Sequence, residues 1–159
     1  METARHWSFE RVEASHIHTI RTRVLRPNYP EGMLCIYPQD ELEGVEHWAA
    51  NDTTGRARAC ITFMSNPSPH ALEEPGVQLR GMAVDDGLRG HGLGARLLDA
   101  ALTGVALSFS PARIVWCNAR VGALSFYDRA GFEQWGELFF IPEAGDHYVM
   151  WRHLPTLIS

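Results

Sequence analysis

Apolar residues along this chain recur with two periods, and the change from one to the other predicts the order of its elements. Alternation of apolar and polar residues, or a short continuous apolar run, is typical of a strand, whereas apolar residues three and four apart are typical of a helix. In the first half these patterns predict a helix with Ser15 as its N-cap and Pro27 after its end. They also predict a hairpin turn at residues 51–55 (Asn-Asp-Thr-Thr-Gly). The predicted elements are a strand at 7–12, a helix at 15–25, a loop at 28–44, strands at 47–50 and 56–64, and a loop at 66–76.

The second half is patterned more sharply. Leu93, Leu97, Ala101 and Val105 recur at helical spacing, and the following Ser-Pro pair at 110–111 ends that helix. The predicted elements are a strand at 77–84, a helix from about 93, a strand at 113–118, a helix at 121–130 with Gly131 as its left-handed C-cap, and strands at 133–141 and 148–154. Hairpins and βαβ crossovers both occur in this order. We therefore expect an α/β protein with a mixed central sheet of about six or seven strands flanked by helices.

Length and composition exclude several classes of protein. A chain of 159 residues is of single-domain length, and a net charge of −5 argues against nucleic acid as a partner. No apolar run approaches the roughly 20 residues that a membrane helix needs, and no signal-peptide core follows the N-terminal residues. The three cysteines form no Cys-x-x-Cys pair, so neither a disulfide framework nor a zinc site is expected. A cytoplasmic protein without a metal is the default expectation.

The most informative motif is a glycine-rich loop between the predicted strand ending at Val84 and the helix beginning near Leu93. Residues 89–94 are Arg-Gly-His-Gly-Leu-Gly. Glycines let the backbone approach a ligand closely, and the helix that follows directs its unpaired N–H groups and the positive end of its dipole into the same space. Arg89 adds positive charge there, and His91 either does the same or points to solvent. A diphosphate is the anion that best fills such a loop.

Two blocks of residues resemble the GNAT superfamily of N-acetyltransferases. The first joins Leu-Arg-Gly-Met-Ala-Val at 79–84 to the glycine loop at 89–94, and the second is the stretch 118–132, where a Phe-Tyr pair precedes Gly-Phe. The resemblance extends over residues 8–154 in element order and implies a single GNAT domain over residues 1–159. It implies acetyl-CoA as co-substrate, whose acetyl group passes directly to a primary amine, expected to be a small molecule, within a ternary complex. Members of this family are commonly dimers, and the oligomeric state here stays open.

The resemblance also assigns roles to residues. It implies that the pantetheine arm lies along the strand through Met82, Ala83 and Val84, and that an N–H near Met82 faces the thioester oxygen. The strands that contain Val77 and Arg113 are expected to diverge there. The diphosphate would rest on the amides of Gly90, His91, Gly92, Leu93 and Gly94. Asn118 either bonds the pantetheine or has no such role.

Proton transfer is assigned less fully. Tyr127 stands where family members place the proton donor to the departing thiolate; the alternative is that its ring packs beside Phe126 and its hydroxyl bonds a carbonyl. The base is open. Gln78 stands in place of the usual glutamate, and Glu73, Glu74, His147 or a chain of water molecules are the alternatives. The missing glutamate also keeps open a CoA-binding regulatory module with little catalysis.

Charged residues in the first half have simpler interpretations. Asp40, Glu41, Glu43 and Glu46 cluster in sequence and form either a solvated acidic loop or a wall that favours a cationic acceptor. Arg21, Arg23 and Arg26 are interpreted together as a solvated or ion-paired helix end. On the strand at 113–118, Trp116 and Cys117 are expected in the core.

Overall fold

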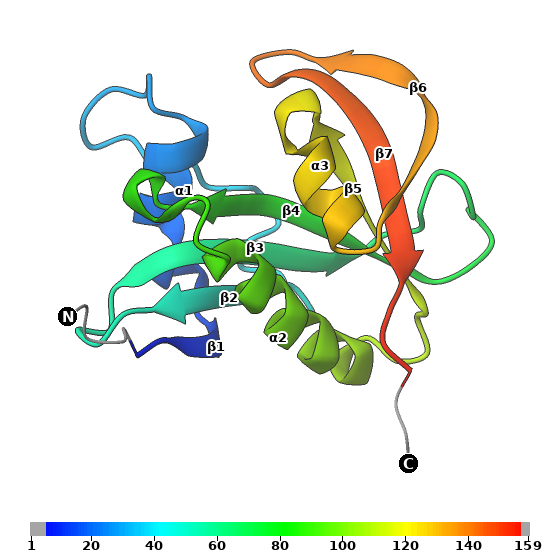
Figure 1. Ribbon diagram of the computed structural model, residues 1–159, viewed down its shortest axis with the longest axis horizontal. Coiled ribbons are helices and arrows are strands. Elements are labelled where there is room, and N and C mark those ends of the chain that lie inside the picture. Colours follow the sequence, from blue (N-terminus) through cyan, green and yellow to red (C-terminus); the bar gives the residue numbers. More distant parts are fainter. Residues whose placement is uncertain (1–5, 157–159) are drawn as a thin grey trace. The chain divides into compact units, whose positions relative to one another are not determined.

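The elements follow one another in the predicted order. The computed structural model describes residues 6–156, and within that range it contains ten principal elements and three short 3₁₀ turns (Figure 1). They are β1 (Ser8–Val12), α1 (His18–Leu25), β2 (Glu46–Asn51), β3 (Ala57–Ser65), β4 (Gly76–Val84), α2 (Leu93–Ser108), β5 (Ile114–Arg120), α3 (Leu124–Arg129), β6 (Glu133–Ile141) and β7 (Gly145–His153), with turns η1 (Ala14–His16), η2 (Asp86–Leu88) and η3 (Val121–Ala123). The sheet has seven strands in the order β1-β2-β3-β4-β5-β7-β6, which confirms the mixed α/β fold. No helix in the described part of the chain is long and apolar enough to cross a membrane.

The chain divides into two compact units, and the boundaries fall inside β3, β4 and α2. The first unit comprises the residues up to 63 together with 81–101, and the second comprises 64–80 and the residues from 102 onward. The glycine loop belongs to the first unit, and Asn118 and Tyr127 belong to the second.

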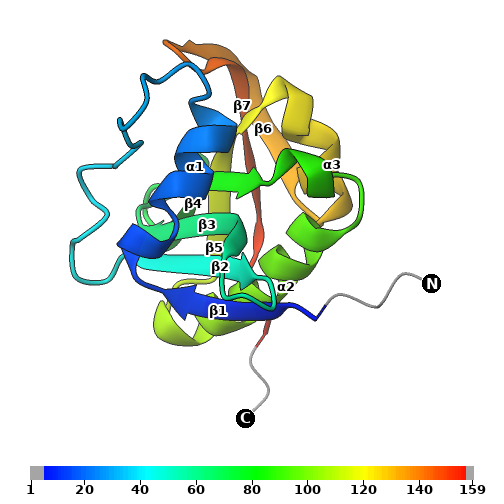
Figure 2. The same ribbon diagram turned by 90° about the vertical axis from the view of Figure 1, so that its left-hand side faces the viewer.

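In the first unit, α1 covers a small apolar cluster on the sheet. β1, β2 and β3 lie side by side in antiparallel order (Figure 2). Ile17 and Ile20 are buried against Ala49 of β2, Cys60 of β3 and Ala83 of β4. The predicted helix is therefore present and packs on the sheet, but the predicted cap is wrong. Residue 15 lies inside η1, and the helix begins after Ile17 with no side-chain cap.

A bulge interrupts β4. Two backbone hydrogen bonds, from Asn66 N to the Gly76 carbonyl and from Asp85 N to the Arg58 carbonyl, show that β3 and β4 run antiparallel. Between these two hydrogen bonds the chain advances eight residues on the β3 side, from 66 back to 58. It advances nine residues on the β4 side, from 76 to 85. One extra residue therefore lies in β4. Gly81 has a φ of +59°, the left-handed backbone that a glycine bulge uses, and is the residue that accommodates it.

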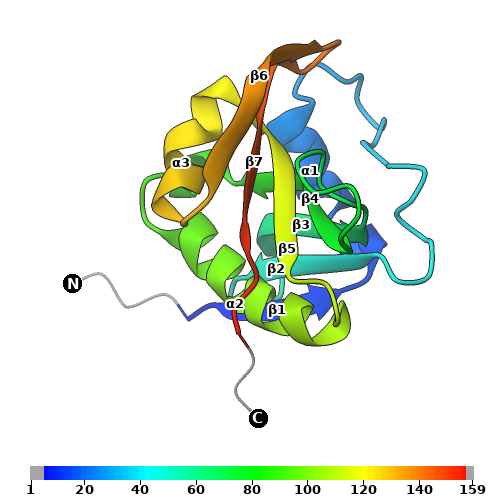
Figure 3. The same cartoon turned by 90° about the vertical axis from the view of Figure 1, so that its right-hand side faces the viewer.

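In the second unit, β5 is the central strand. It pairs in parallel with β4 over Gly76–Gln78 and antiparallel with β7 along its whole length, and β6 pairs with the far side of β7 (Figure 3). β5 and β7 differ from their predicted bounds, since β5 extends to Arg120 and β7 begins three residues earlier than expected. The strands could be longer than their apolar cores because polar residues also pair in a ladder.

The end of α3 agrees with its prediction. Gly131 has a φ of +88°, its N–H donates to the Asp128 carbonyl, and the N–H of Phe132 donates to the Tyr127 carbonyl. These two bonds define a Schellman motif, and the rings of Tyr127 and Phe132 provide the apolar contact that accompanies it. The C-cap therefore also fixes the position of Tyr127.

Candidate active site

The glycine loop presents a row of unpaired main-chain amides. Gly90 and Gly92 have φ values of +80° and +78°, and a Cβ added to either would meet no atom within 4 Å. The first helical bond of α2 runs from Arg96 N to the Gly92 carbonyl, so the amides before it have no partner within the helix. Among the described residues, no hydrogen bond uses the N–H groups of residues 90–94. These amides are oriented by a helix N-terminus and are available to an anion.

The side chains around the loop add less charge than the sequence indicated. Arg89 is exposed and forms a 3.1 Å ion pair with Asp86, while its Nε donates to the Val84 carbonyl at 3.4 Å. His91 is exposed, and the side chain of Leu93 is buried. Residue 93 can therefore present only its main chain, and the main-chain amides are the loop's main candidates for binding an anion.

The strand before the loop alternates in the manner expected of a pairing edge. Ala83 is buried in the apolar cluster, whereas Met82 and Val84 are partly exposed. The ladder between β4 and β5 stops at Gln78 and Trp116, although Leu79 and Arg80 follow in β4 and Cys117 and Asn118 in β5. The side chain of Gln78 accepts a hydrogen bond from Asn66 at 3.0 Å, which gives it a structural partner.

In the second unit, Tyr127 is buried with its hydroxyl on the thiol of Cys117. Its ring makes edge contacts with Phe126 and Phe132, at centroid distances of 5.1 and 5.3 Å. Burial, and then the neighbouring Cys117 to which the hydroxyl donates, raise the pKa of Tyr127 well above its ordinary value. Burial likewise raises the pKa of Cys117, a core residue as predicted. The phenol is thus held in its protonated form, and its partner is a thiol and not a carbonyl.

The far end of β5 places a second group of polar residues on the opposite face from Tyr127. Cys117 faces α3, so Asn118 and Arg120 point the other way, because successive side chains in a strand alternate. His147 of β7 lies directly across from Arg120 and shares its face. Asn118 and Arg120 are both partly exposed, and Asn118 lies across from Val149.

The ring of His147 is held in one tautomer. Its Nδ1 lies 2.7 Å from the Gly145 carbonyl, and the ring stacks on Phe139. A carbonyl only accepts, so Nδ1 carries the proton and, in the neutral ring, Nε2 carries the lone pair. The two glutamates that were alternatives to His147, Glu73 and Glu74, are exposed in the loop before β4.

The charged cluster in the first half differs most from its prediction. Arg21 is fully buried, and its guanidinium forms a bidentate pair with Asp40, with N–O distances of 2.7 and 3.1 Å. Glu46 is also buried, while Glu41 and Glu43 are exposed. The interpretation of the four acids as one solvated loop is therefore wrong. Arg21 is ion-paired, which was one of its two alternatives, but it is buried within α1 and does not lie at a solvated helix end.

Asp40 is saturated with donors. Besides Arg21, it accepts from the Tyr37 amide at 2.9 Å and from His18 Nε2 at 3.0 Å. Burial by itself would raise the pKa of Asp40, but the hydrogen bonds from Arg21 and Tyr37 outweigh it and the pKa lies below its ordinary value. A carboxylate neutralised in this way has no free charge with which to attract a cationic acceptor.

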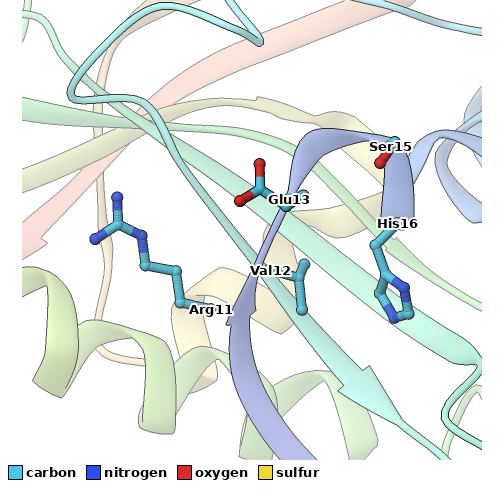
Figure 4. A pocket seen from close by; sticks show the side chains of 5 residues that line it. All are labelled: Arg11, Val12, Glu13, Ser15 and His16. Carbon is cyan, nitrogen blue, oxygen red and sulfur yellow. The ribbon is translucent and has the colours of Figure 1, made fainter.

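A hollow on the outer surface of the first unit lies elsewhere. Arg11, Val12, Glu13, Ser15 and His16 line it, and Figure 4 shows the side chains of Arg11 and His16 pointing away from each other. His16 is already bonded to Asn51 at 2.8 Å. The side chains that line this hollow therefore do not converge on a common point, and we assign no site to it.

Comparisons with known proteins identify relatives of this chain among the acetyltransferases. A family model described as an acetyltransferase (GNAT) domain matches residues 43–134. An uncharacterized N-acetyltransferase of Bacillus subtilis (strain 168), YitI, is 32% identical over 145 residues, which are 91% of this chain and 95% of the relative.

Two solved structures share the fold. An acyl-CoA N-acyltransferase from Pseudomonas aeruginosa superimposes with a TM-score of 0.69 at 21% identity, covering 94% of this chain and 99% of the other. Arabidopsis thaliana NAA60, solved in complex with acetyl-CoA, gives a TM-score of 0.68 at 15% identity, with the same coverage of 94% and 99%.

Proposed function

Since the chain belongs to the GNAT superfamily of N-acetyltransferases, we propose that it transfers the acetyl group of acetyl-CoA directly to a primary amine of a small molecule. One observation carries the proposal. The N–H groups of residues 90–94 stand at the start of α2 with no hydrogen-bond partner among the described residues, and the glycines at 90 and 92 leave the space before them open. A diphosphate supplies the acceptor oxygens that such a row of donors lacks.

The remaining contacts to the co-substrate are assigned from their place around this loop. Arg89 and His91 border the diphosphate, and the main chain of Met82, Ala83 and Val84 pairs with the amide groups of the pantetheine. The end of the β4–β5 ladder at Gln78 supports this assignment, because the ladder between the two strands does not continue beyond that residue. Asn118 contributes a side-chain hydrogen bond from β5.

Transfer requires the amine to arrive without its proton and the thiolate to leave with one. The C–N bond forms as the C–S bond breaks, and the main-chain N–H of Met82 donates to the carbonyl oxygen on which charge develops. Tyr127 donates a proton to the sulfur. The place of Tyr127 in the second sequence block supports that role, and its raised pKa means only that the phenol carries its proton before the reaction.

His147 is the base that the geometry favours. Its Nε2 bears the lone pair, and it lies on the face of β5 and β7 away from Tyr127, so the donor and the base act from opposite faces. The exposed positions of Glu73 and Glu74 support only surface solvation.

The proposal extends to organisation and location. We take residues 1–159 as a single N-acetyltransferase domain with its core at 8–154, because the family model at residues 43–134 includes parts of both units. The three cysteines carry free thiols, which suits the reducing cytoplasm.

Two measurements test the proposal in sequence. Acetyl-CoA at about one hundred times its Kd should stabilise the protein by about 3 kcal/mol, or roughly 5–10 °C in Tm for a chain of this length. Thiol release from acetyl-CoA is then followed over polyamines, amino acids, aminoglycosides and short peptides, and we expect release that depends on one class of amine. An unchanged melting temperature at millimolar acetyl-CoA would refute the site, and release that needs no amine would refute the reaction.

A CoA-binding regulatory module is the second candidate. It is favoured by Gln78, whose side chain is bonded to Asn66 where relatives place a glutamate, so that no carboxylate stands there. Such a module would show the stabilisation by acetyl-CoA and no thiol release with any amine, a combination that the same two measurements recognise.

A further inference from the structure

The guanidinium of Arg21 is buried at the meeting point of α1, the 28–44 loop and the sheet. Nη1 donates to Asp40 at 2.7 Å and to the Cys35 carbonyl at 3.2 Å, and Nη2 donates to Asp40 and to Thr62 of β3 at 2.7 Å. Burying a charge in this way is unfavourable unless it is paired and hydrogen-bonded on all sides. The planar fork of an arginine suits these contacts, which a lysine ammonium does not reproduce.

The 28–44 loop is folded onto this guanidinium. Asp40 bonds Arg21 through both carboxylate oxygens, and the ring of Tyr37 lies under the guanidinium carbon at 4.0 Å from the ring centroid. The Cys35 amide is held in turn by Thr22 of α1 at 2.7 Å. Arg21 thus contacts this loop at three residues, which are Cys35, Tyr37 and Asp40.

One N–H of the guanidinium remains without an acceptor, and it faces the bulge in β4. Among the described residues, Nε of Arg21 is the buried side-chain polar atom that has no hydrogen-bond partner. It lies 3.2 Å from the position that a Cβ on Gly81 would occupy, and the Tyr37 hydroxyl lies 3.0 Å from the same position. Arg21 and Tyr37 together fill the side of the bulge on which Gly81 has no side chain.

We propose that Arg21, held by Asp40, is a positioning residue that fixes the bulge at Gly81 and thereby the direction of the Met82 N–H in acetyl transfer. The inference rests on the proposed function. A bulge re-aims the residue that follows it, and Met82 is that residue. An oxyanion donor must be aimed at the transition state before the reaction, so a rotation of this amide lowers turnover without changing the contacts that bind the diphosphate.

The test compares Arg21→Lys with the matched control Arg23→Lys on the same helix. The first variant keeps a positive charge beside Asp40 but has neither the Nε nor the planar group that packs on Gly81. The control alters an exposed arginine whose ion pair is with Asp85 at 3.0 Å. We expect Arg21→Lys to lower kcat by about tenfold or more, with the KM for acetyl-CoA within about twofold of its original value. Arg23→Lys should leave both within about twofold.

A second variant tests the same inference in case Arg21→Lys does not fold. Tyr37→Phe leaves the Arg21–Asp40 pair intact and removes only the hydroxyl beside Gly81, at a partly exposed position. It should lower kcat by about threefold, again without a matching change in KM. Original kcat values in both Arg21→Lys and Tyr37→Phe, or equal losses in kcat and in CoA affinity, would overturn the inference.

An amide spectrum separates this inference from the proposed function. In ¹⁵N-labelled protein, Arg21→Lys should shift the Gly81 and Met82 resonances and Arg23→Lys should leave them in place. If the original protein releases no thiol with any amine, the proposed reaction has failed, and the spectrum alone decides whether Arg21 positions the bulge. Unmoved Gly81 and Met82 resonances in Arg21→Lys would then refute it.

Discussion

Replacing Gly92 by alanine separates the binding role of the glycine loop from its contribution to stability. Gly92 has a φ of +78°, and a Cβ at this position would meet no atom within 4 Å. In the free protein Gly92→Ala therefore creates no collision, and its only penalty is an alanine in the left-handed region, about 1–2 kcal/mol. One kcal/mol lowers Tm by roughly 2–4 °C in a chain of this length, so we expect a loss of about 2–8 °C.

The hairpin between β2 and β3 provides a matched control. Gly55 has a φ of +83° and is equally open, with nothing within 4 Å of an added Cβ. Gly55→Ala should therefore lose the same free energy of unfolding as Gly92→Ala, through the same backbone term. It lies in a turn fixed by Asp52, whose carboxylate accepts from Thr54 and the Arg56 amide and whose pKa is lowered to about 2 mainly by the Thr54 hydroxyl.

The two variants should differ in their affinity for CoA. A methyl group at position 92 stands where phosphate oxygens must approach the amides of the loop, so we expect a loss of about tenfold or more, which is about 1.4 kcal/mol. Gly55→Ala should bind as the original protein does. Calorimetric titration with CoA below both melting temperatures measures the difference, and differential scanning calorimetry verifies the matched stabilities. Equal CoA affinities in the two variants would show that the diphosphate does not rest on this loop.

Three further outcomes follow from the described contacts. Tyr127→Phe keeps the ring contacts with Phe126 and Phe132 and should lower turnover by about tenfold or more with Tm within about 4 °C, whereas unchanged turnover would remove Tyr127 from the mechanism. His147→Gln should lower turnover by about tenfold, and turnover equal to that of the original protein would exclude His147 as the base. Asp40 has a lowered pKa in the folded state, so it contributes stability above its ordinary value of 3.8 that is lost as pH falls through the folded value. Asp40→Asn should consequently lose less stability than the original protein between about pH 5 and pH 2, and parallel curves from urea unfolding would contradict this.

Features formed by neighbouring residues were predictable from the sequence. The helix α1, the hairpin turn before β3 and the Schellman motif at Gly131 each depend on neighbouring residues, and each is present. The glycine loop belongs to the same class, because its open amides arise from local backbone geometry. The N-cap of α1 was not predictable in this way. Ser15 has the right residue type, but the chain enters the helix through η1 and places Ile17 at the cap instead.

Features formed by distant residues could not be predicted. Arg21 and Asp40 are 19 positions apart, and Arg21 and Thr62 are 41 apart. Nothing in the spacing of the three arginines distinguishes the buried one from Arg23, which is exposed and pairs with Asp85. An arginine is buried only where several acceptors converge on it, and their convergence is a property of the folded loop and sheet.

At the bulge in β4, a feature formed by neighbouring residues depends on residues that are distant in sequence. Its extra residue becomes visible only when β4 is counted against β3, since the sequence 77–84 by itself is an unbroken strand pattern. A left-handed glycine inside a strand has few contacts of its own to hold it, so its geometry must come from the surroundings. Here the surroundings are the guanidinium of Arg21 and the hydroxyl of Tyr37, both supplied by the first half of the chain. The residues proposed to bind the diphosphate are therefore local in sequence, while the residue expected to face the reacting carbonyl is aimed by contacts that only the tertiary structure creates.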